Sequence, residues 1–192
     1  MNVRLSIILL FVLALVGGYF YFIELRKPGE TKTPPLWFYN TDDSNFNLIS
    51  VTYQGKNVTF AKDKDGGWHF ADPKGEAVDI NRWGGITLLL RGPQSRRLLS
   101  ENPNPKDIAS YGLEHPGTTI TVGMVDGSKF ALYLGDKTPD RTSHYAQMEG
   151  FPQLFLIDAS WGDVLDRLVT EPPHQPTPTP VDTPVPSGTP AN

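Results

Sequence analysis

Four histidines and several carboxylates are the side chains that could perform catalysis or bind a metal. The histidines are spread along the chain, and no two have the spacing of a metal-binding pair; they are His69, His115, His144 and His174. Ser, His and Asp are all present, but a catalytic triad is recognised from geometry, and no nucleophile-elbow motif occurs. Cysteine is absent, which excludes disulfides, thiolate ligands and a cysteine nucleophile. The sequence therefore assigns no catalytic, metal-binding or cofactor-binding residue.

Two local motifs resemble ligand sites but are better explained as turns. Residues 135–138 read Gly-Asp-Lys-Thr, like the end of a phosphate loop, yet the earlier glycine is missing and Pro139 follows directly. Carboxylates surround the segment that contains Trp68, but they lack the spacing of a calcium-binding EF-hand; they are Asp63, Asp65, Asp72 and Glu76. We expect both groups to be solvated turn residues.

The aromatic cluster of Trp37, Phe38 and Tyr39 is the candidate interaction surface. The other tryptophans, Trp68, Trp83 and Trp161, fall on predicted core faces, so we expect them to pack inside the domain. Trp37 has no such constraint and lies close to the N-terminal apolar segment in sequence. The cluster is therefore expected to contact either the membrane interface or a partner protein.

Residues 5–23 form an apolar segment in which Ser6 is the one strongly polar side chain. As a helix rising about 1.5 Å per residue, this segment is long enough for a hydrocarbon core of about 30 Å. Tyr19 and Tyr21 resemble an interfacial aromatic belt. The alternative is a cleaved signal peptide, but the apolar run is long and lacks a small-x-small cleavage site. We expect an uncleaved single-pass anchor at residues 5–23, in contact with membrane lipid, after a short segment at 1–4.

Charges alone do not place the domain on one side of the membrane. Arg26, Lys27 and Lys32 follow the apolar segment and only Arg4 precedes it, which favours a cytoplasmic domain. The short polar N-terminus, however, is typical of a signal anchor, and the proline- and threonine-rich C-terminus resembles an extracytoplasmic stalk. We therefore expect a cell-membrane protein with an extracytoplasmic domain.

Composition divides the remaining chain into three parts. Residues 24–35 are rich in proline and charge and read as a linker, whereas residues 36–169 carry the periodic apolar pattern of an α+β domain. Residues 170–192 are dominated by proline and threonine and are expected to form a disordered tail. The formal net charge of -4 argues against a nucleic-acid partner.

The first half of the domain reads as strands followed by a helix. Residues 36–40 could open the domain as a strand, and alternating apolar positions predict three more strands around Val51, Phe60 and Trp68. Residues 79–90 have the apolar spacing of a helix, which Gly84-Gly85 interrupts. A strand at 94–100 and a short helix capped by Asn104 follow.

The second half repeats this order. Two alternating segments flank the hairpin turn Asp126-Gly127, further strands follow at 144–149 and 153–157, and a last helix begins near Ser160 with Asp163 completing a near capping box. The sequence therefore predicts a largely antiparallel sheet built from a duplicated ββ-β-α unit, with halves at about 46–92 and 117–169.

Several short motifs, taken in order, resemble those of a known family. The motifs are Gly66-Gly67-Trp68 with Pro73, Tyr111-Gly112-Leu113 with Pro116, residues 135–138, and Tyr145-Ala146. Over about residues 48–168 the chain resembles domain of unknown function 4340. The resemblance implies a membrane anchor, an extracytoplasmic domain and, for some members, a partnership with gliding-type ABC transport systems. It implies no catalytic residue, and Gly84-Gly85 departs from the plain amphipathic helix of the pattern.

These features together predict a non-enzymatic, membrane-tethered accessory or interaction domain, which the resemblance connects with an ABC-type transport complex. Two alternatives stay open. The aromatic residues and the Pro/Thr-rich tail suit a module that binds cell wall or polysaccharide, and an extracytoplasmic hydrolase with an unrecognised site is the other.

Overall fold

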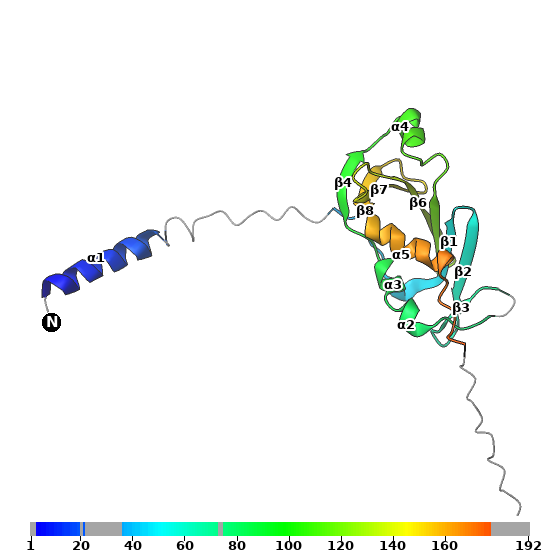
Figure 1. Cartoon of the computed structure of the whole chain (residues 1–192), viewed down its shortest axis with the longest axis horizontal. Coiled ribbons are helices and arrows are strands. Elements are labelled where there is room, and N and C mark those ends of the chain that lie inside the picture. The colour runs from blue at the N-terminus through cyan, green and yellow to red at the C-terminus, as the bar shows by residue number, and fades with distance from the viewer. Residues whose placement is uncertain (1–2, 20, 22–35, 73–74, 178–192) are drawn as a thin grey trace, which may run out of the picture. The chain divides into compact units, whose positions relative to one another are not determined.

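A computed structural model describes residues 3–19, 21, 36–72 and 75–177 (Figure 1). The chain divides between Pro35 and Leu36 into two units, and each is considered separately. The predicted linker at 24–35 lies outside the described residues, as do residues 1–2.

The first unit contains helix α1, Val3–Tyr19. Apolar side chains occur around its whole circumference, and those that are described are exposed. The predicted anchor continues to residue 23, but residues 20, 22 and 23 lie outside the described part. Across the residues that the structure describes, no helix has both the length and the apolar character needed to cross a membrane.

The second unit is an α+β domain with a large antiparallel sheet and few helices, which confirms the predicted fold class at this level. Its eight strands lie in the order β3-β2-β1-β5-β6-β7-β8-β4. Their bounds are β1 Phe46–Tyr53, β2 Lys56–Lys62, β3 Trp68–Phe70, β4 Ser95–Ser100, β5 Thr118–Met124, β6 Lys129–Lys137, β7 Ser143–Met148 and β8 Leu154–Asp158. A single turn of 3-10 helix, η2 Asp43–Asn45, precedes β1.

Both halves of the domain start with a meander of antiparallel strands, and the two meanders meet at β1 and β5. In this central pair Ile49 lies opposite Val122 and Val51 lies opposite Ile120. The hairpin between β5 and β6 turns at Gly127, which has a positive φ of 86°. Strand β4 leaves the first half and pairs with β8, so it forms the far edge of the sheet.

The helix predicted at 79–90 is present as two short helices, α2 Ile80–Trp83 and α3 Ile86–Leu89. Gly85 separates them in the left-handed conformation, with φ 86°. Only glycine adopts this conformation without a steric penalty from a Cβ atom. The glycine pair therefore explains why the apolar spacing of one helix is divided between two.

The helices α4 Pro105–Ser110 and α5 Ala159–Thr170 both have side-chain N-caps. Asn104 accepts a hydrogen bond from the Asp107 amide, as predicted. The cap of α5 is Asp158, which accepts from Ser160, so the predicted start near Ser160 lies slightly too late in the chain. Hydrogen bonds from Ser160, then the Arg96 side chain, lower the pKa of Asp158 to about 2.

The core lies between one face of the sheet and the helices α2, α3 and α5, which share that face (Figure 1). Trp68, Trp83 and Trp161 are buried, which confirms the prediction that they pack inside. Trp161 Nε1 donates to the carbonyl oxygen of Leu89 at 3.0 Å and so joins α5 to the end of α3. Burial of aromatic side chains of this size is the main source of stability in such a core.

The folded domain continues beyond its predicted boundary at residue 169. The backbone amide of Asp79 donates to the Pro173 carbonyl at 2.8 Å. The His174 ring stacks on Phe70 with centroids 4.5 Å apart, and Gln175 Nε2 donates to the Val78 carbonyl. The first residues of the predicted tail are therefore part of the fold, and residues 178–192 lie outside the described range.

Candidate interaction surfaces

The sheet face opposite α5 carries a patch of uncharged polar side chains. Side chains alternate between the two faces along a strand. The residues that alternate with the buried ones in the central strands therefore point to this opposite face and form the patch. Two rows of cross-strand neighbours make it up. We call it the open face, and it comprises Thr59, Ser50 and Thr121 in one row and Asn57, Thr52, Thr119, Tyr133 and Gln147 in the other.

Asn57 organises one end of the open face. Its Nδ2 donates to Ser50 Oγ at 2.8 Å and to Thr52 Oγ1 at 2.9 Å. Its Oδ1 accepts from Thr59 Oγ1 at 3.0 Å, and the hydroxyls of Ser50 and Thr59 lie 2.8 Å apart. These bonds fix the side chains in place, so a ligand or partner would meet hydrogen-bonding groups that are already ordered.

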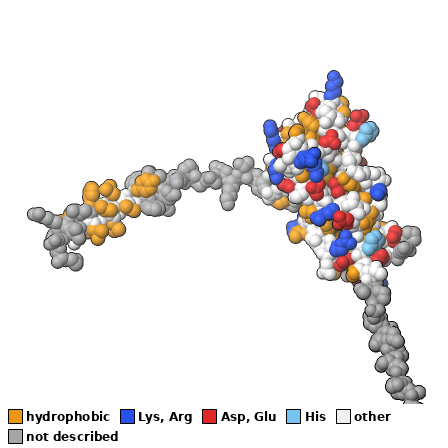
Figure 2. Space-filling model, in the orientation of Figure 1, with side chains coloured by type: hydrophobic (Ala, Val, Ile, Leu, Met, Phe, Trp, Pro, Cys, Tyr) orange, Lys and Arg blue, Asp and Glu red, His pale blue; other side chains and the backbone are white. Residues whose placement is uncertain are grey.

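The open face differs in charge from the surface seen in Figure 2, where acidic and basic side chains are intermixed. None of its eight residues is ionisable at neutral pH, and seven of the eight are half-buried, Asn57 being exposed. The Glu149 carboxylate lies at its border and is hydrogen-bonded to Tyr133. Removing neutral hydroxyls and amides from water costs less than removing charges. The open face could therefore be covered by a partner at a low desolvation cost.

A second surface feature is a groove of about 380 Å³ lined by Trp37, Asn40, Leu88, Arg91 and Gly92. We call it the Trp37 groove. The exposed fraction is 41% for Trp37 and 61% for Leu88, both high for large apolar residues. A Cβ atom at Gly92 would lie 1.9 Å from the Tyr39 carbonyl oxygen, so the groove floor requires glycine.

Of Trp37, Phe38 and Tyr39, which were predicted to form an interaction surface, Trp37 alone is exposed. Phe38 is 6% exposed and packs against Phe155. The Tyr39 hydroxyl donates to the Leu90 carbonyl at 2.8 Å, and burial raises the pKa of Tyr39. Both side chains belong to the core.

The strand predicted at 36–40 is also absent. Trp37 forms a single bridge with Gln94, and the Phe38 amide donates to the Pro93 carbonyl. Proline has no amide hydrogen to return that bond, so the ladder does not continue. The three consecutive aromatic residues have the composition of a strand, but this segment forms only the bridge at Trp37 and no continuous ladder with a partner strand.

A polar cluster lies under α5 and was missed by the sequence argument. His144 is 6% exposed; its Nδ1 lies 3.1 Å from the Gly135 carbonyl oxygen. Its buried Nε2 has no hydrogen-bond partner in the described structure and lies 3.9 Å from Asp163 Oδ1. Lys137 Nζ donates to the same oxygen at 2.6 Å. His144 and Ala146 alternate with the half-buried Tyr145 along β7. This alternation is the sequence signal that could have placed the His144 side chain on the buried face of the sheet.

This cluster has basic and acidic groups but no space for a substrate. A Cβ atom at Gly162 of α5 would lie 3.0 Å from the His144 ring, so the helix backbone packs directly on it. His69 is half-buried, and its Nε2 forms a hydrogen bond of 2.7 Å with Asp63. Within the described ranges no three His, Asp or Glu side chains are placed to hold a metal ion.

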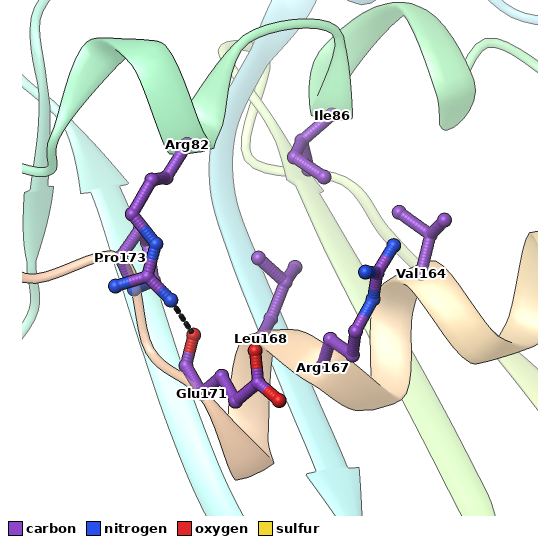
Figure 3. A pocket seen from close by; sticks show the side chains of 7 residues that line it. All are labelled: Arg82, Ile86, Val164, Arg167, Leu168, Glu171 and Pro173. Carbon is purple, nitrogen blue, oxygen red and sulfur yellow. Dashed lines mark hydrogen bonds between the residues drawn. The ribbon is translucent and has the colours of Figure 1, made fainter.

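A third feature is a cavity of about 240 Å³ between α2–α3 and α5 (Figure 3). Apolar side chains of Ile86, Val164 and Leu168 line it, and Arg82, Arg167, Glu171 and Pro173 complete it. The Arg82 guanidinium donates to the carbonyl oxygens of Glu171 and Pro172 at 2.9 and 3.0 Å. A cation at the C-terminal end of a helix is favourable, so Arg82 here holds the chain that returns after α5.

Comparison with known proteins identifies the family of the chain. A family model, Domain of unknown function (DUF4340), matches residues 68–171, more than half of the 192 residues. The match runs from β3 through α5 and includes the β5 and β6 parts of the open face. Neither the curated proteins nor the solved structures contain a match to the chain. The resemblance predicted for residues 48–168 is thus confirmed from residue 68 onward, and the chain belongs to the DUF4340 family.

Proposed function

We propose that the protein is a non-enzymatic accessory domain, tethered to the cell membrane and extracytoplasmic, whose open face docks a membrane protein complex. An ABC-type transporter is the complex that the sequence resemblance suggests. The observation that carries this proposal is the absence of ionisable side chains among the eight residues of the open face, which Glu149 borders at Tyr133. Charged residues are depleted at the centres of protein interfaces, whereas they are common on solvated surfaces.

The tether in this proposal is residues 5–23. The segment is almost wholly apolar, and the described part of α1 has apolar side chains on all sides. A helix that is apolar all round needs an apolar environment, either a protein core or lipid. Within the first unit the described apolar side chains of α1 are exposed, and lipid is the environment that we propose for them.

Cross-linking in intact membranes, followed by purification of the full-length protein in mild detergent, tests the docking role. The proposal predicts a stoichiometric membrane partner that is lost when Thr121→Lys places a charge in the middle of the open face. Thr170→Lys, at an exposed position of α5, is the matched control and should keep the partner. A protein that stays monomeric under cross-linking, or a partner retained by both variants, would contradict the proposal.

A second candidate function is binding of a neutral polysaccharide, and the ordered hydroxyl and amide groups around Asn57 favour it. Sugar hydroxyls pair with such groups, and an aromatic ring such as that of the half-buried Tyr133 can stack on a sugar. Sedimentation with purified wall material tests this alternative. Pelleting that Thr121→Lys abolishes would favour it, and a protein that stays in the supernatant would argue against it.

We also infer that the domain is a duplication, with halves at about 46–92 and 117–169. The two meanders that meet at β1 and β5, and the placement of α2, α3 and α5 on one sheet face, support this idea. Among the described residues between β3 and α2, no strand corresponds to β8. Superposition of the halves in an experimental structure should align β1-β2-β3 with β5-β6-β7; a poor fit of these strands would reject the duplication.

A further inference from the structure

We propose that the Trp37 groove contacts the headgroup region of a membrane that contains anionic lipids. This inference rests on the proposed tether and adds a second contact between the domain and the same membrane. It concerns a different surface from the open face, so a protein partner and a lipid surface would be bound at separate places.

The apolar part of the groove suits the membrane interface. Trp37 and Leu88 line it, and Leu36, the neighbour of Trp37, is 41% exposed. All four tryptophans of the chain are described, and among them Trp37 alone is exposed. Tryptophan is enriched at membrane interfaces because its ring is apolar and its indole N–H can bond to headgroups or water.

Basic side chains accompany these apolar residues. Arg91 lines the groove and lies 3.5 Å from Asp43, a loose pairing in which the arginine side chain is 51% exposed. Arg96 and Arg97 follow shortly after Gln94, the bridge partner of Trp37; Arg96 pairs with Asp158, and Arg97 is exposed. Arginine next to exposed tryptophan and leucine is the combination that binds anionic lipid surfaces.

Chain connectivity limits how far the groove can be from the proposed anchor. Leu36 and Trp37 come directly after residues 24–35, and the apolar segment ends at residue 23. A fully extended chain of that length spans at most roughly 40 Å. The local concentration of lipid at the groove would therefore be high, so a weak surface contact would be populated.

Fluorescence quenching in vesicles tests this contact on the full-length protein. The protein is reconstituted into phosphatidylcholine vesicles with brominated acyl chains, with and without phosphatidylglycerol. We expect quenching and a blue shift of the exposed tryptophan's emission, both larger with phosphatidylglycerol, and loss of both in Trp37→Phe. The buried tryptophans remain as an internal reference for the folded state.

Two variants distinguish lipid contact at the Trp37 groove from a nonspecific approach of the domain to the vesicle surface. Leu88→Asp and Arg91→Glu should lower the quenching to that of Trp37→Phe, and Val125→Asp, at an equally exposed apolar position outside the groove, should leave it unchanged. Alkaline carbonate extraction reports the tether independently. If the protein resists extraction but Trp37 is not quenched, the groove proposal is wrong and the tether stands; extraction into the supernatant would remove the tether and the groove proposal together.

Discussion

The Thr118 hydroxyl donates a hydrogen bond of 2.7 Å to Asp166 Oδ1, which joins the start of β5 to the middle of α5. Asp166 is partly buried, and burial raises its pKa although this hydrogen bond acts in the opposite direction. Lys137 and His144, nearby in the same cluster, also favour the charged form. The charged form of Asp166 therefore lowers the stability of the folded state, and the size of this effect depends on pH.

The sign of this dependence follows from the raised pKa. The folded state binds the Asp166 proton more tightly than the unfolded chain, so this group favours folding below its ordinary pKa of 3.8. That contribution is lost as the pH rises through the raised value. We expect Asp166→Asn to remove this dependence and to stabilise the domain near neutral pH by at most about 1 kcal/mol, because the site is only partly buried.

Urea unfolding of both proteins at several pH values measures the effect. The difference in free energy of unfolding should favour the variant more at pH 7 than at pH 4. A variant that is equally destabilised at both values would show that the bond from Thr118 to the charged carboxylate outweighs burial.

Gly162 allows α5 to lie directly on His144. A Cβ atom there would approach the His144 ring and Leu134 Cδ1 to 3.0 Å. We expect Gly162→Ala to lower the free energy of unfolding by about 1–3 kcal/mol, as overpacking of a core does. Gly117→Ala, where a Cβ atom has open space, is the control. Thermal unfolding of the two variants gives the comparison, and equal melting temperatures would mean that α5 can move away from the sheet.

The two glycines between α2 and α3 should respond differently to alanine. Gly85 has a positive φ of 86°, whereas Gly84 has φ -50° and a Cβ atom there would lie 3.3 Å from the Ile80 carbonyl oxygen. We expect Gly85→Ala to destabilise the domain by about 1–2 kcal/mol and Gly84→Ala by less. Chemical denaturation ranks them, and stabilisation by both substitutions would indicate one continuous helix in solution.

Local signals in the sequence predicted most of the elements but not their long-range partners. The glycine pair, the Asn104 cap and the alternation around Val51 act over a few residues, and each prediction is confirmed. Phe38, Tyr39 and His144 were misjudged or missed because their environment is set by Phe155, Leu90 and Gly162, which are far away in sequence. The open face likewise depends on register across the strands β2, β1, β5 and β6.

Arg82 joins α2 to the chain after α5 through hydrogen bonds to the Glu171 carbonyl, drawn in Figure 3, and to the Pro172 carbonyl. We expect Arg82→Ala to lower the free energy of unfolding by about 1 kcal/mol, since two charge-assisted hydrogen bonds are lost at a solvent-exposed site. Arg167→Ala, in the same cavity, should have a smaller effect because, among the described residues, the Arg167 side chain makes no hydrogen bond or ion pair and its backbone carbonyl accepts one, from the Glu171 amide. Scanning calorimetry distinguishes them. Equal losses would assign the effect to the cavity lining rather than to the hydrogen bonds.

The docking role of the open face is tested most directly by a photo-activated cross-linking residue placed at Thr119 or Thr121 of the full-length protein in intact membranes. The same residue at Thr170 of α5 is the reference. We expect one discrete adduct with a membrane protein from both open-face positions and none from residue 170. Adducts of equal yield from all three positions, or from residue 170 alone, would contradict it.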